Sequence, residues 1–591
     1  MKNFKTKAIS LALALVTCFA ASGCGNGLRP DDNTGGKVDD AKTQLYIGLG
    51  TNGLSEYMEA AKADFEEKYK NVSFEEGKTG VQVFYGYEEK FSNFDTLPLN
   101  YTGYQEKLII TENVPYDRIK KMAMDITDVV TTPLNQSVVS GESARTETAT
   151  IESKMLPQYK EYFDADGHYY ALPSQLSRGG LVYDETLFEK NNLYFASETA
   201  THFYEYECTN AYTGKKATYR FVDDGYTKED LSKGPDGAAG TYDDGLPATY
   251  EEFFALCDYM KKEWGIEPVR WAGKVQSYMM GVAELLAANF EGSEFALKTR
   301  FNGTAHNLVK FDDNGKIIFG EDGKPETRSL EINNENGYEL TAQLGFYYAL
   351  KFMDAFLKSN YYDNDLCFNG TSDHLTTQTL YLLSDKDSKV SSIAMLAEGS
   401  WWYGEAAGTF KDMAQKYGEE WSAENRKFAY LPMPKADASY VGTQETTYAV
   451  LNMTSFITND ASEGLAKAAK LFMRDMYSRE GLLKFLSITG QVRPYSLDLT
   501  DAEYESLTRF GKSNYDTMTH NNILFLPSDN VLYRTNNSIL DATYNFHWTS
   551  NLGETLTFVL KAGSSADEYF ENVHDFWNQA KWDSYYKGTA Y

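Results

Sequence analysis

The chain has 591 residues, of which 42% are hydrophobic and 24% are charged, and its formal net charge at pH 7 is −29. This length supports a large core and exceeds one ordinary domain, so we expect two lobes. So acidic a surface repels nucleic acid and anionic membrane, which excludes nucleic acid as a partner. It favours a neutral or cationic partner, although solubility alone also explains the charge.

The N-terminus has the pattern of an exported lipoprotein. Three lysines precede an apolar run at 9–21 that is too short for an ordinary membrane-spanning helix. The tetrapeptide Ala-Ser-Gly-Cys that ends at Cys24 resembles a lipobox, with Ala21 where leucine is usual. We therefore predict a signal peptide at 1–23 and a diacylated Cys24, which would hold the protein on the outer face of a membrane by lipid alone. A plain secretory signal is the alternative. Residues 24–43 are rich in Gly and Asp and predict a flexible tether.

Three further cysteines follow the tether: Cys208, Cys257 and Cys367. Their wide spacing matches no metal-ligand motif and no disulfide framework. The sequence leaves open whether two of them form a disulfide.

The body of the protein opens with a β-α-β pattern. Apolar residues predict a strand at 44–50, a helix at 54–69 and a second strand at 81–85, and hence a parallel sheet. Ligands of such sheets bind beyond the carboxyl ends of the strands, which places Asn52 and 85–87 near a cleft. The glycines of GLGTNG after the first strand match a dinucleotide pattern, but the second strand does not end in the acidic residue that such a site needs. We interpret them as a turn.

One stretch concentrates aromatic residues. An apolar run at 393–397 predicts a buried strand, and the turn that begins at Glu398 leads to Trp401, Trp402 and Tyr403 at the start of a helix. Three adjacent large rings point in different directions, so one core does not easily take all three. A flat ring beside a carboxylate suits a sugar, which presents C–H groups to the ring and hydroxyls to polar partners. The alternative is a set of core aromatics.

A Gly/Asp-rich segment at 234–245 reads GPDGAAGTYDDG. Closely spaced oxygen ligands with glycines for sharp turns suit a calcium ion, although the segment is not an EF-hand. The candidate calcium ligands are Asp236, Thr241, Asp243 and Asp244. A solvated acidic turn is the alternative, and we expect no other cofactor.

Strands alternate with helices in two groups along the whole chain, which predicts an α/β fold with two lobes. In this order the chain also carries GGLVYDETLFEKNN at 179–192, LPATYEEFFALCDYMK at 246–261, MLAEGSWWYGE at 395–405 and a late helical segment followed by TGQVRPY. With the lipobox, these motifs resemble the extracellular solute-binding lipoproteins of carbohydrate ABC transporters, which are relatives of maltose-binding protein.

The resemblance implies a periplasmic-binding-protein-like fold in which hinge strands join two lobes that close on a ligand. Lobe one would comprise 44–175 and about 447–507, and lobe two would comprise about 176–446 and 508–591. The chain is longer than is usual in the family, and the surplus falls at 193–247 and 301–329.

The resemblance also implies that the protein binds a carbohydrate outside the cell, as a monomer and without catalysis, and delivers it to an ABC transporter permease. The ligand-binding residues that we expect are Trp401, Trp402, Tyr403, Tyr278, Tyr533, Asn52, Gln175 and Glu398. One alternative is a surface-anchored glycoside hydrolase, for which Glu398 and Glu405 are a candidate carboxylate pair. Another is a binder of a non-sugar solute such as a peptide or a polyamine.

Overall fold

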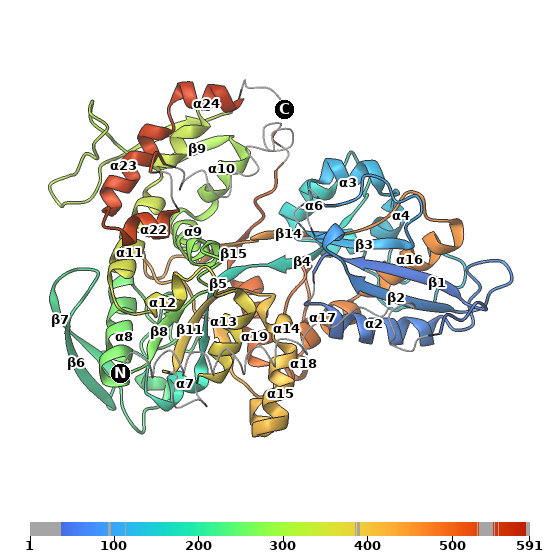
Figure 1. Ribbon diagram of the computed structural model, residues 1–591, viewed down its shortest axis with the longest axis horizontal. Coiled ribbons are helices and arrows are strands. Elements are labelled where there is room, and N and C mark those ends of the chain that lie inside the picture. The colour runs from blue at the N-terminus through green and yellow to red at the C-terminus, as the bar shows by residue number, and fades with distance from the viewer. Residues whose placement is uncertain are drawn as a thin grey trace. The chain divides into compact units, whose positions relative to one another are not determined.

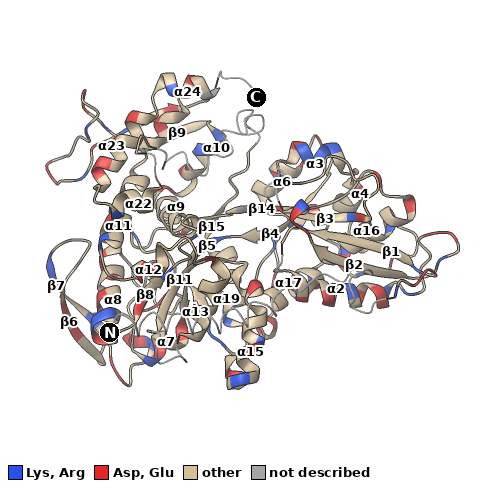
Figure 2. Ribbon diagram, in the orientation of Figure 1, with Lys and Arg blue, Asp and Glu red and all other residues tan. Residues whose placement is uncertain are grey.

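The computed structural model describes residues 37–586, apart from 52, 93–95, 113, 385, 387–390, 529, 531–547, 549 and 553–554. The chain forms two compact units. Unit 1 comprises the residues up to Arg178, Ser400–Arg426 and Ala449–Met518. Unit 2 comprises Gly179–Gly399, Lys427–Tyr448 and the residues from Thr519 onward. Acidic and basic residues occur throughout both units (Figure 2).

Unit 1 is built on a five-stranded sheet with the strand order β2-β1-β3-β14-β4 (Figure 1). Its strands are β1 (Thr43–Leu49), β2 (Val81–Tyr87), β3 (Glu106–Glu112), β4 (Leu172–Ser177) and β14 (Leu451–Ile457). β1 pairs in parallel with both β2 and β3, whereas β14 runs antiparallel to β3 and β4. The predicted parallel β-α-β opening is therefore confirmed, with α2 (Ser55–Lys68) as its crossover helix.

The other helices of unit 1 are short and mostly amphipathic. They are α3 (Tyr116–Met122), α4 (Thr127–Thr131), α5 (Ile151–Lys154), α6 (Pro157–Phe163), α14 (Trp402–Glu405), α15 (Ala407–Tyr417), α16 (Glu463–Met476), α17 (Arg479–Thr489), α18 (Asp501–Glu505) and α19 (Arg509–His520), whose last two residues fall in unit 2.

α16 covers the sheet of unit 1 and carries a buried charge. The helix packs against β1 and β3, and the side chain of its Arg474 is fully buried. Arg474 donates from Nε to Glu142 Oε1 at 2.7 Å and from its other nitrogens to four backbone carbonyls. All three guanidinium nitrogens of Arg474 thus have hydrogen-bond partners, which burial of a charged group requires.

Unit 2 is built on a four-stranded sheet with the order β12-β5-β11-β8. The strands are β5 (Gly179–Asp184), β8 (Glu267–Arg270), β11 (Ile393–Gly399) and β12 (Phe428–Tyr430). All seven residues of β11 are buried, which confirms the buried strand predicted at 393–397. β11 runs parallel to β8 and antiparallel to β5.

Helices and three two-stranded ribbons complete unit 2. The helices are α7 (Glu185–Lys190), α8 (Tyr250–Glu263), α9 (Ser277–Glu291), α10 (Leu297–Arg300), α11 (Leu344–Lys358), α12 (Asn364–Cys367), α13 (His374–Leu383), α22 (Leu556–Lys561), α23 (Ala566–Phe576) and α24 (Gln579–Tyr586). The ribbons pair β6 (Phe203–Thr209) with β7 (Lys216–Val222), β9 (Gly303–Val309) with β10 (Thr327–Ile332), and β13 (Thr446–Tyr448) with β15 (Asn522–Leu524). The first two ribbons lie in the segments 193–247 and 301–329 or border them.

The boundaries of the units differ from the predicted lobes mainly at two segments, Ser400–Arg426 and 508–518. The prediction assigned Ser400–Arg426 to lobe two, whereas its contacts place it in unit 1. The physical reason is contact with residues of unit 1: the backbone at Gly404 lies against that of Gly53, and Asn514 of α19 donates to the carbonyl of Gly490 at 2.9 Å. Trp402 and Tyr403 in turn contact Phe510 of α19, so the two segments join unit 1 together.

Among the residues that the structure describes, no helix has both the length and the apolar character needed to cross a membrane. Cys208, Cys257 and Cys367 are buried free thiols. Cys24 lies outside the described residues.

Candidate functional site

The candidate site lies at the carboxyl ends of the parallel strands of unit 1. In the paired register Leu49, the last residue of β1, lies beside Tyr87 of β2 and Ile110 of β3. Beyond these positions lie Gly50 of the turn after β1, Glu88 after β2 and, two residues past Ile110, Glu112 at the end of β3. Because the strands are parallel, these residues share one edge of the sheet, where α/β proteins bind ligands.

A pair of glycines brings Trp401 to this edge. Trp401 caps the N-terminus of the one-turn helix α14, and α14 approaches the turn after β1 closely. A Cβ atom at Gly404 would lie 2.5 Å from the carbonyl oxygen of Gly53, and a Cβ at Gly53 would lie 3.5 Å from that of Trp401. A side chain at position 404 would push the two backbones apart, so glycine there permits the contact.

The three adjacent aromatic residues take different environments. Trp402 is fully buried and Tyr403 is 5% exposed. The Tyr403 ring stacks on Phe510 with centroids 4.6 Å apart, and its hydroxyl donates to the carbonyl of Ala423. Both residues anchor α14 in the core, so their rings do not present a face to a ligand, contrary to our expectation. Trp401 is partly exposed, and it is the one ring of the three that fits the ligand role.

Two carboxyl groups stand at the same edge. Burial and the nearby carboxylate of Glu405 in α14 together raise the pKa of Glu112 from 4.5 to about 7. Burial also raises the pKa of Tyr87, helped by the charges of Glu89 and Glu112. With its pKa near neutral, the carboxyl group of Glu112 can serve as a hydrogen-bond donor when protonated and as an acceptor when ionised.

Sequence reasoning missed Glu112. The residue stands in no motif, and the single available signal was its position at the end of a strand parallel to β1. That signal depends on knowing that β3 lies next to β1 in the sheet, which the sequence does not specify.

Gln175 lies in β4 and is 4% exposed. Its amide nitrogen donates to Oε1 of Gln491, which is itself 1% exposed and also accepts from Ser400 Oγ at 3.5 Å. Gln175 Oε1 and Gln491 Nε2 are buried without a hydrogen-bond partner among the described residues. The structure thus places Gln175 in a buried pair with Gln491 in unit 1, and one acceptor and one donor of this pair have no hydrogen-bond partner among the described residues.

The remaining expected ligand contacts fall elsewhere. Glu398, at the end of β11 in unit 2, is 2% exposed and accepts from Gly399 N at 2.9 Å and from Gln378 Nε2 at 3.3 Å. Tyr278 lies partly exposed in the first turn of α9, also in unit 2. Asn52 and Tyr533 lie outside the described residues.

The predicted calcium ligands lie in one turn, where the three acids accept hydrogen bonds and the Thr241 hydroxyl donates. Asp243 accepts from Thr241 Oγ1 at 2.6 Å and from Asp236 N at 2.9 Å, and Asp244 accepts from Gly240 N at 2.7 Å. Burial raises the pKa of Asp243 to about 6. Within the described part of the chain, no three acidic, His or Cys side chains are grouped as a metal site. Calcium binding stays a prediction, and the geometry favours the acidic-turn alternative.

No protein-family model matches the chain, and no curated protein sequence matches it. Solved structures are similar to it at low identity. A binding protein of an ABC transporter from Bifidobacterium animalis subsp. lactis, in complex with mannobiose, is 14% identical, with 93% of this chain and 95% of that one covered and a TM-score of 0.49. A chitin oligosaccharide binding protein is 13% identical, over 90% and 99% of the two chains, with a TM-score of 0.46. An ABC substrate-binding protein from Listeria monocytogenes, in complex with cycloalternan, is 13% identical, over 91% and 99%, with a TM-score of 0.44.

Proposed function

We propose that this protein binds a neutral carbohydrate outside the cell and delivers it to an ABC transporter permease. The observation that carries the proposal is the placement of Trp401. A partly exposed ring stands at the carboxyl edge of a parallel sheet, beside two carboxyl groups that accept or donate hydrogen bonds.

The aromatic ring and the carboxyl groups would contact different parts of a sugar. The indole of Trp401 offers a flat apolar face to the C–H groups of a sugar ring. Glu112 and Glu405 offer oxygens to its hydroxyls, and because the pKa of Glu112 is raised to about 7, this pair carries less negative charge near neutral pH than two ordinary carboxylates. The pair therefore attracts a cation less strongly than two ordinary carboxylates would, and its oxygens suit the hydroxyls of a sugar.

The resemblance of the sequence motifs to carbohydrate-binding lipoproteins supports the remaining parts of the proposal. Ligand contact with both units would stabilise a closed arrangement through differential affinity, and a permease would recognise that arrangement. A diacylated Cys24 would keep the protein at the outer face of the membrane. No step of this mechanism breaks a covalent bond, so we propose a binding protein and not an enzyme.

Titration calorimetry of residues 24–591 against mono- and oligosaccharides tests the proposal. We expect binding without turnover, whose tight component is lost in Trp401→Ala and kept in Trp264→Ala, a control that removes a 43% exposed indole from the end of α8. A neutral ligand also predicts an affinity that hardly changes with salt concentration. Appearance of hydrolysis products would establish a hydrolase instead, and equal loss of binding in both variants would contradict the placement of the site.

A further inference from the structure

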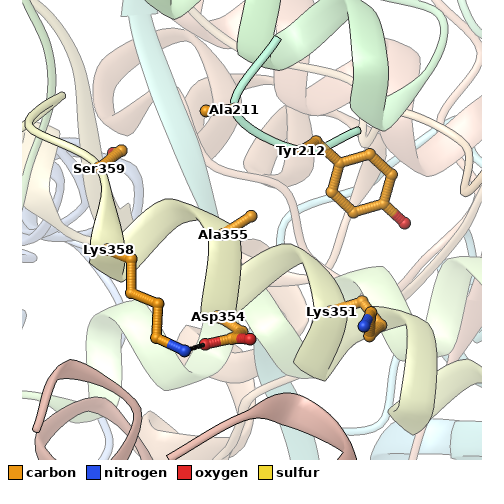
Figure 3. Close-up of a pocket in the computed structure, with 7 residues that line it drawn as sticks. All are labelled: Ala211, Tyr212, Lys351, Asp354, Ala355, Lys358 and Ser359. Carbon is orange, nitrogen blue, oxygen red and sulfur yellow. Dashed lines mark ion pairs between the residues drawn. The ribbon is translucent and has the colours of Figure 1, made fainter. Parts of the chain in front are cut away.

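The two segments that the sequence analysis marked as surplus meet at one place in unit 2. A pocket with a volume of about 520 Å³ is lined by Tyr212 from the first segment, by Phe319 and Lys324 from the second, and by Tyr347 and Tyr348 of α11. A neighbouring pocket of about 510 Å³ shares Tyr212 and Lys351 with it (Figure 3). We propose that these two pockets together, here called the tyrosine pocket, form an accessory binding site for a neutral carbohydrate.

The first segment presents Tyr212 through a fixed turn between β6 and β7. Asn210 is fully buried, and its Oδ1 accepts from the backbone N–H groups of Tyr212 at 2.9 Å and of Thr213 at 3.2 Å. Its Nδ2 donates to the carbonyl of Glu251 at 2.7 Å, which ties the turn to the start of α8. The Tyr212 ring stacks on Phe254 of α8 with centroids 5.6 Å apart. Tyr212 is therefore pre-positioned in the free protein, which lowers the entropic cost of binding.

In the second segment, residues 310–326 connect β9 to β10, and two ion pairs link this connection to the rest of unit 2. Lys316 Nζ lies 2.7 Å from Glu571 of α23, and Lys324 Nζ lies 2.9 Å from Asp437. Between these anchors the Phe319 side chain is 43% exposed, and its ring centroid lies 6.5 Å from that of Tyr347. Phe319 lines the pocket together with Tyr347 and Tyr348, so its exposed ring is part of an aromatic wall that a ligand in the pocket would contact.

Tyrosine hydroxyls supply the polar part of the pocket. Burial raises the pKa of Tyr348 to about 12, and burial with the neighbouring Tyr348 also raises the pKa of Tyr212. Both hydroxyls therefore keep their protons at physiological pH. No hydrogen bond of either hydroxyl occurs within the part of the chain that the structure describes, so both remain to donate to and accept from a ligand.

Six of the seven charged residues that line the tyrosine pocket pair with one another, and the seventh, Glu251, accepts a hydrogen bond from the Tyr219 hydroxyl at 2.7 Å. Lys324 pairs with Asp437, Lys351 lies 3.6 Å from Asp567, and Lys358 lies 2.5 Å from Asp354, as the dashed line in Figure 3 marks. An anionic ligand would have to displace the acidic partner of one of these lysines, and a cationic ligand would have to displace a lysine or pair with Glu251. Aromatic faces, neutral hydroxyls and paired charges together select a neutral polyhydroxylated ring, which is the chemistry of an uncharged sugar.

The tyrosine pocket belongs entirely to unit 2, whereas Trp401 and Glu112 belong to unit 1. Binding at the tyrosine pocket therefore does not depend on the proposed main site. Its test uses the Trp401→Ala variant, in which the main site is disabled. Saturation-transfer NMR of that variant with maltotriose, cellobiose, mannobiose and diacetylchitobiose at millimolar concentration reports binding outside the main site.

We expect at least one of these sugars to bind the Trp401→Ala variant, with an affinity that does not change with salt. Adding Phe319→Ala or Tyr348→Phe should weaken that binding at least about fivefold. Adding Tyr204→Ala, which removes a 46% exposed tyrosine from β6 outside the pocket, should leave it unchanged. Thermal unfolding of each variant checks that the fold is intact.

The proposal is overturned if none of the four sugars binds the Trp401→Ala variant, even where one of them binds the wild type. It is also overturned if Phe319→Ala and Tyr204→Ala have equal effects in a folded protein. An affinity that falls steeply with salt would refute the neutral class of ligand.

Discussion

The raised pKa of Glu112 predicts that the stability of unit 1 falls as pH rises, and that the variant Glu112→Gln removes this dependence. The folded state binds the Glu112 proton more tightly than the unfolded state does, between the unfolded value of 4.5 and the folded value of about 7. Unfolding in this window releases a proton, so the stabilising contribution is complete below pH 4.5 and is lost as pH rises through 7.

The rise in pKa sets the magnitude. A change from 4.5 to about 7 corresponds to at most about 3.4 kcal/mol, at ~1.36 kcal/mol for each pH unit. Solvent screens a partly exposed carboxyl group, so we expect a loss of about 1 to 2 kcal/mol between pH 5 and pH 8. Glu112→Gln keeps the size of the side chain without its charge, so it should be more stable than the wild type by this amount at pH 8 and by little at pH 5.

The assay has to report on unit 1 alone, because two units can unfold separately. Hydrogen exchange of peptides from β3, corrected for the intrinsic effect of pH, gives the free energy of opening at that strand. Glu76→Gln is the matched control, since it removes an exposed carboxylate from a turn of the same unit. Parallel pH profiles for Glu112→Gln and the wild type would refute the reasoning.

Three further predictions follow from other parts of the chain. Arg474→Met should destabilise unit 1 by about 3 kcal/mol or more in denaturant unfolding, because it removes the arginine donor from four backbone carbonyls and one of the donors to Glu142. Lys470→Met removes an ion pair with Asp128, whose side chain is 45% exposed, and should cost less than about 1 kcal/mol. Equal losses in the two variants would contradict the role of burial. If the 234–245 turn binds calcium, the melting temperature rises with calcium over chelator and Asp243→Asn abolishes the rise, whereas equal melting temperatures would rule the site out. Cys24→Ser should move the protein from the detergent phase to the aqueous phase in a phase-partition assay and abolish labelling by a fatty-acid analogue, and unchanged partition would disprove the lipid anchor.

The sequence by itself determined the local elements and the class of fold. Hydrophobic periodicity is a local property, so the strand at 44–50, the helix at 54–69 and the buried strand at 393–397 were all predicted close to where β1, α2 and β11 lie. The motif at Trp401 was also visible, because three adjacent aromatic residues after a buried strand are unusual wherever they occur.

Tertiary structure decided which of these elements belong together. Trp402 and Tyr403 follow a strand of unit 2 in the sequence, yet contacts of their segment with Gly53 and Phe510 place them in unit 1. Glu112 acquired its raised pKa from burial and from Glu405, almost three hundred residues away in the sequence. The tyrosine pocket likewise needs two insertions to meet on α11. Pairing across such separations depends on side-chain packing in three dimensions, which residue spacing does not encode.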